Sequence, residues 1–369
     1  MRKTTRFTVV EMSGSRYEMG RQYGKQCRTL IRKLAGRFDA MLVPEEYLAE
    51  ARKVAMGALP VMKREAPHLV EEVEGIAAGA GLDFDDVFRL SCSQEMNAWQ
   101  GCMRKRAENT VIDACSSFTV KHGGSSLVAW NMDWWIKWQP FMVLLHGQPD
   151  DGPSFLSFAM AGSIGRPGLS EGISIAANYV PYRADADQAV GGDKWAGAGV
   201  PYSFMSRMLL EQPSTAAALK LLKRTPRMSC LNYTLGDTVG DICCVETMPN
   251  DMSVIRPTKG DSFVAHANSY HARKFGGLTE AKQKAHDPRA WLGRQSLRMR
   301  ERLHQPLERS DLYYAQRRHF PGQSTGTCVH TPGERPSITL LSFVGDLAKQ
   351  EVWAAWGSPC EHQFMRYGL

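Results

Sequence analysis

The cysteine at position 115 is the residue of this sequence best placed to act as a nucleophile. It stands in residues 113–118 (DACSSF), where small residues open a β-prone segment. A thiol beside a free α-amino group has a built-in base, because that amine has a reference pKa of about 7.7–8.0. Only scission of the Ala114–Cys115 bond supplies such an amine. The sequence therefore raises a self-processing hypothesis, against the alternative that Cys115 is a small buried hydrophobe.

The segment just before Cys115 is polar and charged. Residues 104–114 read RKRAENTVIDA and separate a helical start from a strand-rich remainder. Exposed connections of this kind are the preferred sites of chain cleavage. We therefore predict a helical segment 1–114 and a catalytic region 115–369, which together form one domain. We expect the two fragments to stay associated after cleavage.

Hydrophobic periodicity divides the chain into alternating helical and strand-rich parts. Apolar residues recur at helical intervals in 17–42, 45–63, 68–80 and 84–96. From residue 115 onward, short β-prone runs are separated by Gly, Pro, Asp and Ser clusters. Helical patterns at 202–211, 216–223 and 287–303 alternate with further strand candidates. This order predicts an α+β domain in which helices are layered over antiparallel sheets.

The bulk composition excludes several classes of protein. Of 369 residues, 43% are hydrophobic and 22% charged, and the net charge of +7 comes without any base-reading motif, so no nucleic-acid partner is expected. No apolar run suits a secretory signal or a membrane span. The nine cysteines show no CxxC or Cys/His ligand spacing. The sequence thus predicts neither a metal site nor a disulfide framework, and reduced thiols indicate a cytoplasmic location.

Several ordered motifs resemble the isopenicillin N acyltransferase family, relatives of the choloylglycine hydrolases and acid ceramidases. Members begin their large subunit with a Cys-Thr-Ser-like tripeptide after autoproteolysis, and residues 115–118 (CSSF) match it. Further blocks follow in family order: 130–134 (WNMDW), 168–172 (GLSEG) with Asn178, 207–211 (RMLLE), 232–237 (NYTLGD) with Glu246, 266–268 (HAN) and 357–360 (GSPC). The resemblance implies the N-terminal-nucleophile hydrolase fold, a four-layer αββα sandwich with a helical N-terminal segment.

The resemblance also implies roles for individual residues. Cys115 would be the nucleophile with its own amine as base, and Asp133 would orient that amine. Asn268 would donate its amide to the developing oxyanion, a donation typically worth about 3–4 kcal/mol of barrier. Asn178 would be either a second donor or a strand-edge amide. The structural alternatives are a turn cap for Asp133 and a turn residue for Asn268.

Two residues are candidates for substrate contacts. Trp134, in a cluster of four tryptophans, is a candidate for lining an acyl pocket. Arg294 could orient a carboxylate, although its helix also presents a basic face made of Arg289, Arg294, Arg298 and Arg302. Two positions depart from the family pattern. Ala114 stands where Gly usually precedes the nucleophile, and Trp130 stands where relatives often carry Arg or Gln.

These residues favour acyl transfer from a small-molecule N-acyl amide, through a thioester on Cys115, to water or a second amine. No metal or organic cofactor is expected, although a coenzyme A thioester could be the acyl donor, and a homo-oligomer is left open. The alternatives are an unprocessed Cys–His thiol hydrolase using His266 or His271, and a non-catalytic binding protein on the same scaffold. A GxSxG match at 322–326 lacks a preceding strand and a following helix, so we predict a loop there.

Overall fold

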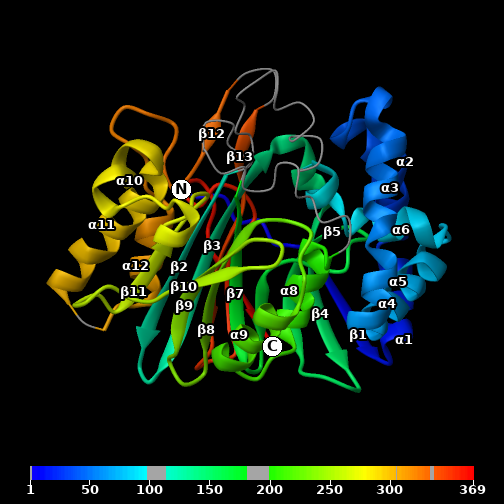
Figure 1. The fold of residues 1–369 in the computed structure, drawn as a ribbon, viewed down its shortest axis with the longest axis horizontal. Coiled ribbons are helices and arrows are strands. Elements are labelled where there is room, and N and C mark those ends of the chain that lie inside the picture. Colours follow the sequence, from blue (N-terminus) through cyan, green and yellow to red (C-terminus); the bar gives the residue numbers. More distant parts are fainter. Residues whose placement is uncertain (1, 98–113, 181–198, 305, 333–335) are drawn as a thin grey trace.

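The fold was analysed in a computed structural model, which describes residues 2–97, 114–180, 199–304, 306–332 and 336–369 (Figure 1). Residues 104–113 of the segment predicted to be cleaved lie outside these ranges. Two β-sheets form the centre of the molecule, and helices cover them.

The larger sheet has eight strands in the order β1-β4-β5-β6-β7-β8-β9-β10. The pairing of β1 with β4 is parallel, whereas the other neighbours are antiparallel. The strands are β1 (Val9–Gly14), β4 (Met142–Pro149), β5 (Phe155–Met160), β6 (Gly168–Ser170), β7 (Ile173–Tyr179), β8 (Leu231–Asp237), β9 (Ile242–Thr247) and β10 (Met252–Ile255).

The smaller sheet has seven strands, six of them in the order β11-β2-β3-β13-β14-β15, with β12 paired to β13. All of its pairings are antiparallel. The strands are β2 (Ala114–His122), β3 (Ser125–Trp135), β11 (Phe263–His266), β12 (His330–Thr331), β13 (Ser337–Asp346), β14 (Glu351–Ala355) and β15 (Met365–Gly368).

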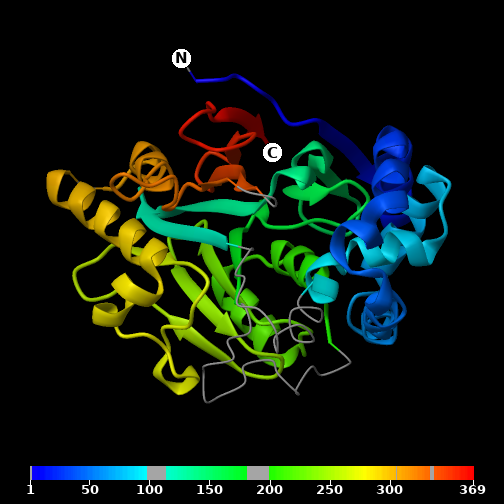
Figure 2. The same ribbon diagram turned by 90° about the horizontal axis from the view of Figure 1, so that it is seen from above.

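The two sheets pack face to face, with β2 and β3 against β7 and β8. Helices α11 (Pro288–Leu303) and α12 (Arg309–Gln316) cover the outer face of the smaller sheet, and α10 (Glu280–His286) packs on α11. Helices α8 (Tyr202–Leu210) and α9 (Thr215–Arg224) lie on the larger sheet. Because both faces of the central strands are covered, every residue of β8 is buried. The expected αββα layering of an α+β domain is confirmed (Figure 2).

The N-terminal helices stand beside the β1–β4 edge of the larger sheet, opposite α10–α12 (Figures 1 and 2). They are α1 (Arg16–Gln26), α2 (Arg28–Leu42), α3 (Leu48–Gly57), α4 (Leu59–Glu65), α5 (Pro67–Ala80) and α6 (Phe84–Leu90), with a short 3-10 turn, η1 (Glu45–Tyr47). Helices α1 and α5 approach so closely that a Cβ on Gly20 would lie 2.0 Å from the Glu72 carbonyl oxygen. Glycine is therefore required there for packing rather than for flexibility.

Most predicted elements are present, and five were missed. Strands β1, β6 and β15 and helices α10 and α12 lie in regions for which the sequence pattern predicts no helix or strand. The GxSxG match forms a loop between α12 and β12, as predicted, so it is not a nucleophile elbow. Among the described residues, no helix combines the length and apolar character needed to cross a membrane.

Candidate active site

Cys115 lies near the start of β2, in the middle of the molecule where the two sheets meet. It is the second residue of the strand, opposite Met132 of β3, and its side chain is buried. Strand β11 pairs with β2 only from His266–Ser117 onward, so the β-ladder on that side ends before Cys115. The backbone nitrogen of Cys115 is bound instead by a side chain, donating to Asn268 Oδ1 at 2.8 Å.

Asn268 lies two residues beyond the end of β11 and provides the hydrogen-bond acceptor that the β-ladder lacks at this point. Its Oδ1 also accepts a hydrogen bond from Arg289 Nη2 at 2.9 Å, and its Nδ2 donates to the Tyr179 carbonyl at 2.6 Å. The two donors on Oδ1 fix the orientation of the carboxamide. In the uncleaved chain Asn268 thus accepts a hydrogen bond from the backbone nitrogen of Cys115. One of the two hydrogens on its Nδ2 is already donated to Tyr179. Its role as an oxyanion donor remains a prediction.

The turn that carries Asn268 is held by the β8–β9 hairpin. Asn232 Nδ2 donates to the carbonyls of Ala267 and Ser269, both at 2.9 Å, so it binds the residues on either side of Asn268. Glu246 accepts hydrogen bonds from His266 Nε2 and from the backbone nitrogens of His271 and Ala272. The block of Asn and Glu noted in the sequence therefore positions the Asn268 turn.

Asp133 pairs with Ala114 across β2 and β3, one residue from the nucleophile. Its side chain is buried, with Oδ1 accepting from Thr339 Oγ1 at 2.6 Å and Oδ2 lying 3.5 Å from Arg289 Nη1. Burial raises the pKa of Asp133 from 3.8 to about 7, against the opposing effects of the Arg289 charge and the Thr339 hydrogen bond. This carboxyl group can therefore change its protonation state near neutral pH.

Arg289 joins Asp133 to Asn268, and the sequence analysis did not identify it as a site residue. Its guanidinium makes both contacts from the second position of α11. We had grouped it with the basic face of that helix. Arg294, Arg298 and Arg302 follow each other at four-residue spacing, whereas Arg289 precedes Arg294 by five residues and so points about 140° away. This angular offset is the feature of the sequence that could have distinguished Arg289 from the basic face.

The other predicted residues take different positions. Asn178 on β7 is fully buried and donates to Ser117 Oγ at 2.6 Å, two residues from Cys115. Trp134 is also buried and stacks on Trp138 with ring centroids 5.0 Å apart. Arg294 donates to Gln283 Oε1 at 2.6 Å, within the α10–α11 pair. The hydrogen bonds of Arg294 thus hold α11 to α10 and to the Ala265 carbonyl of β11, and they do not reach Asp133 or Asn268.

A buried cation lies between two aromatic rings near the site. The Arg166 guanidinium lies 5.4 Å from the ring of Trp134 and 5.5 Å from that of Tyr202. Burial raises the pKa of the Tyr202 phenol, and a nearby charge on Cys115 adds to that shift, which places Tyr202 in the neighbourhood of the nucleophile. In the part of the chain that the structure describes, no carboxylate lies within ion-pair distance of Arg166.

Comparison with known proteins gives one family match and several remote structural similarities. The model of the acyl-coenzyme A:6-aminopenicillanic acid acyl-transferase family matches residues 120–361. No curated protein matches the sequence significantly.

Among solved structures, a Caenorhabditis elegans N-acylethanolamine-hydrolyzing acid amidase ortholog is similar at 15% identity and a TM-score of 0.45, over 63% of this chain and 93% of the other. A mutant conjugated bile acid hydrolase from Clostridium perfringens is similar at 11% identity and a TM-score of 0.40, over 69% and 97% of the two chains. Because the family match covers well over half of the sequence, this chain belongs to the acyl-coenzyme A:6-aminopenicillanic acid acyl-transferase family.

Proposed function

We propose that this chain is an N-terminal-nucleophile cysteine amidohydrolase or N-acyltransferase that exposes Cys115 by cutting its own Ala114–Cys115 bond. One observation carries the proposal. The backbone nitrogen of Cys115 is bound by the Asn268 carboxamide at a place where the strand ladder has ended. An acceptor built for that nitrogen would continue to hold it as a free amine after cleavage, with the nitrogen lone pair available to the thiol.

The processing step uses the same residues as catalysis. The Cys115 sulfur attacks the Ala114 carbonyl carbon, the C–N bond breaks, and the chain passes to sulfur as a thioester while the nitrogen takes up a proton. Water then opens the thioester, leaving a carboxylate on Ala114 and a free thiol and amine on Cys115. The buried network of Asn268, Arg289 and Asp133 supports this step because it fixes the nitrogen that must leave.

Catalysis then repeats the chemistry on an external substrate. The amine of Cys115 takes the thiol proton, and the thiolate attacks the carbonyl carbon of an N-acyl amide. The amine product leaves with that proton, and a thioester remains on Cys115. Water or a second amine accepts the acyl group and restores the thiol. We infer that hydrolysis predominates because water is always present, and a coenzyme A thioester could load the same sulfur.

The surroundings of the site suggest the type of acyl group. Trp134 and Tyr202 flank the buried guanidinium of Arg166, which also donates to Ser93 Oγ at 3.2 Å. Aromatic planes suit an apolar acyl chain, and the guanidinium suits a carbonyl or carboxylate on it. N-acyl amides whose acyl portion carries an aromatic ring or a terminal carboxylate are therefore the first substrates to test.

The two fragments are expected to remain together because the cut does not separate the sheet. Strand β1 of the first fragment pairs with β4 of the second along six residue pairs. Glu72 on α5 also forms a fully buried, bidentate ion pair with Arg207 on α8 at 2.7 and 3.0 Å. Separating the two fragments would deprive each of these charges of its partner, which is strongly unfavourable.

A panel of N-acyl amides, including penicillins and N-acyl amino acids, tests the function. The measurement is the mass of the Cys115-containing peptide after acid quenching. We expect an added acyl mass on that peptide, and no turnover or adduct with Cys115→Ala. Cys115→Ala also separates the proposal from a Cys–His mechanism, because only a self-processing chain would lose its cleavage together with its turnover. Turnover by Cys115→Ala at the wild-type rate would contradict the proposal.

A further inference from the structure

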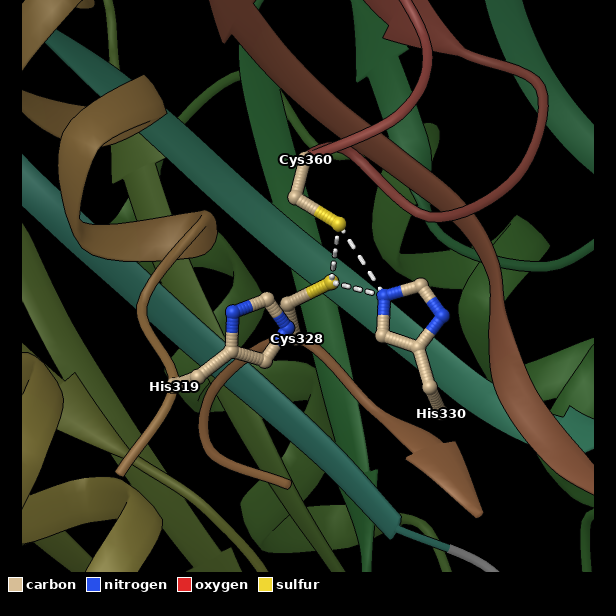
Figure 3. Close-up of side chains that lie close together, drawn as sticks. All are labelled: His319, Cys328, His330 and Cys360. Carbon is tan, nitrogen blue, oxygen red and sulfur yellow. Dashed lines mark hydrogen bonds between the residues drawn. The ribbon is translucent and has the colours of Figure 1, made fainter. Parts of the chain in front are cut away.

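Four potential metal ligands, three from the segment 319–330 and one from the C-terminal loop, meet beside the smaller sheet. His319 follows α12, Cys328 lies just before β12, His330 is the first residue of β12, and Cys360 lies in the loop between β14 and β15. Figure 3 shows the four side chains converging, and their ligand atoms all lie within 4.8 Å of one another. The set is therefore Cys2His2, although the sequence contains no recognisable Cys/His motif.

The distances among Cys328, His330 and Cys360 can be compared with the edges of a tetrahedron around zinc. Zn–S bonds of about 2.3 Å and Zn–N bonds of about 2.0–2.1 Å give edges of about 3.8 Å between two sulfurs and about 3.6 Å between sulfur and nitrogen. Cys328 Sγ lies 3.6 Å from Cys360 Sγ and 3.5 Å from His330 Nε2. Cys360 Sγ lies 3.0 Å from His330 Nε2. Two of these edges thus match the zinc geometry and the third is shorter, while the ligand atom of His319 lies within 4.8 Å of the other three.

Two further observations indicate a cation at this position. His319 Nε2 is buried and has no hydrogen-bond partner among the described residues, which is unfavourable unless something else binds it. Glu361 lies 3.8 Å from His330 Nδ1, where metal-bound histidines commonly have a carboxylate partner.

We propose that His319, Cys328, His330 and Cys360 bind one Zn²⁺ ion in a closed structural site. Four protein ligands leave no open coordination position for water or substrate, so the ion holds the fold together rather than taking part in acyl transfer. The other cluster of possible ligands, Glu246 with His266 and His271, is not equivalent. Its carboxylate already accepts hydrogen bonds from a ring nitrogen and two backbone nitrogens.

The position of the zinc site links it to the active site. Val329, between two of the ligands, donates its nitrogen to Thr339 Oγ1 and accepts from the Thr339 nitrogen, both at 3.0 Å. Thr339 Oγ1 in turn donates to Asp133. The ion would therefore tie the C-terminal loop and the 319–330 segment to the strand that orients Asp133.

The test uses the full-length chain with Cys115→Ala, so that the active-site thiol cannot bind metal. We expect one zinc ion per chain after incubation with ZnCl₂ and dialysis against metal-free buffer. Replacement by Co²⁺ should give a tetrahedral visible spectrum with sulfur-to-cobalt charge transfer. Cys360→Ser and His319→Ala should each weaken zinc binding by more than about 100-fold, beyond the 10–100-fold typical of an outer-sphere partner. Cys27→Ala, a buried cysteine outside the cluster, is the control and should bind as before.

Three results would overturn the proposal. The first is a chain that takes up no zinc, and the second is a set of variants that bind zinc as tightly as their parent. The third is a Cys328–Cys360 disulfide in the isolated protein, found by peptide mapping. Should a variant fail to fold, the parent protein still decides the matter. Zinc must then protect Cys328 and Cys360, and not Cys27, from alkylation by iodoacetamide.

Discussion

Replacing Asp133 by Asn should stabilise the chain at alkaline pH while abolishing its activity. Burial raises the pKa of Asp133 from 3.8 to about 7, so between these values the folded chain holds a proton that the unfolded chain has released. The free energy of unfolding therefore falls as pH rises through this window. Three pKa units at 1.36 kcal/mol each amount to about 4 kcal/mol, fully expressed above pH 7. An Asn side chain carries no charge at any of these pH values, so the variant does not lose stability in this way.

The assay is urea-induced unfolding at several pH values in the Cys115→Ala background, where the chain stays in one piece. The double variant should be about 4 kcal/mol more stable than its parent at pH 8, and the difference should vanish near pH 4. Glu351→Gln is the control. Burial tends to raise the pKa of Glu351, but the hydrogen bonds from Trp353 and Arg366 outweigh it and the pKa is lowered. Its variant should lose a constant amount of stability between pH 5 and 8. A stability difference for Asp133→Asn that does not depend on pH would refute the reasoning.

Three further perturbations address the site and the fold. Thr339→Val removes the 2.6 Å hydrogen bond to Asp133. Because hydrogen bonds to charged groups contribute about 1.5–3 kcal/mol, the acid limb of the kcat/KM profile should move up by about 1–2 pH units. Thr339→Ser keeps the hydroxyl group and should not shift the profile. Arg289→Met should lower the rate of chain cleavage, followed by denaturing gel electrophoresis, more than Arg289→Lys does, because lysine keeps the charge next to Asp133; equal rates would argue against this ion pair. Gly20→Ala should lower the unfolding free energy by about 2 kcal/mol or more through overpacking, measured with urea, whereas Gly36→Ala in α2, with open space around it, should raise it by about 0.5–1 kcal/mol.

The layered fold could be predicted, and three candidate site residues could be proposed, because their signals are local in the sequence. Cys115, Asp133 and Asn268 each lie at or near a strand with recognisable neighbours, and the structure connects Cys115 to Asn268 directly. Arg289 was missed because charge on a helix usually indicates a solvated face, and only its angular offset distinguishes it. Its contacts with Asp133 and Asn268 depend on how α11 lies across β2 and β11, which is a tertiary feature.

The missed elements have similar physical causes. Helix α12 is short, and its capping box uses Glu308 and Asp311 in place of the usual Ser/Thr and Glu/Gln pair. The Cys2His2 cluster escaped notice because its fourth ligand, Cys360, lies thirty residues after His330 and is brought to the other three only by the packing of the C-terminal loop. The three ligands within 319–330 do not have the spacing of a common zinc motif.

The central claim is that Cys115 gains a free amine by scission of its own peptide bond. Intact mass spectrometry under denaturing conditions, on protein that turns over an N-acyl amide, tests it most directly. We expect two polypeptides, one ending at Ala114 and the other beginning with an unblocked Cys115, and a single uncut chain for Cys115→Ala. An active preparation in which residues 114 and 115 are still joined would contradict it.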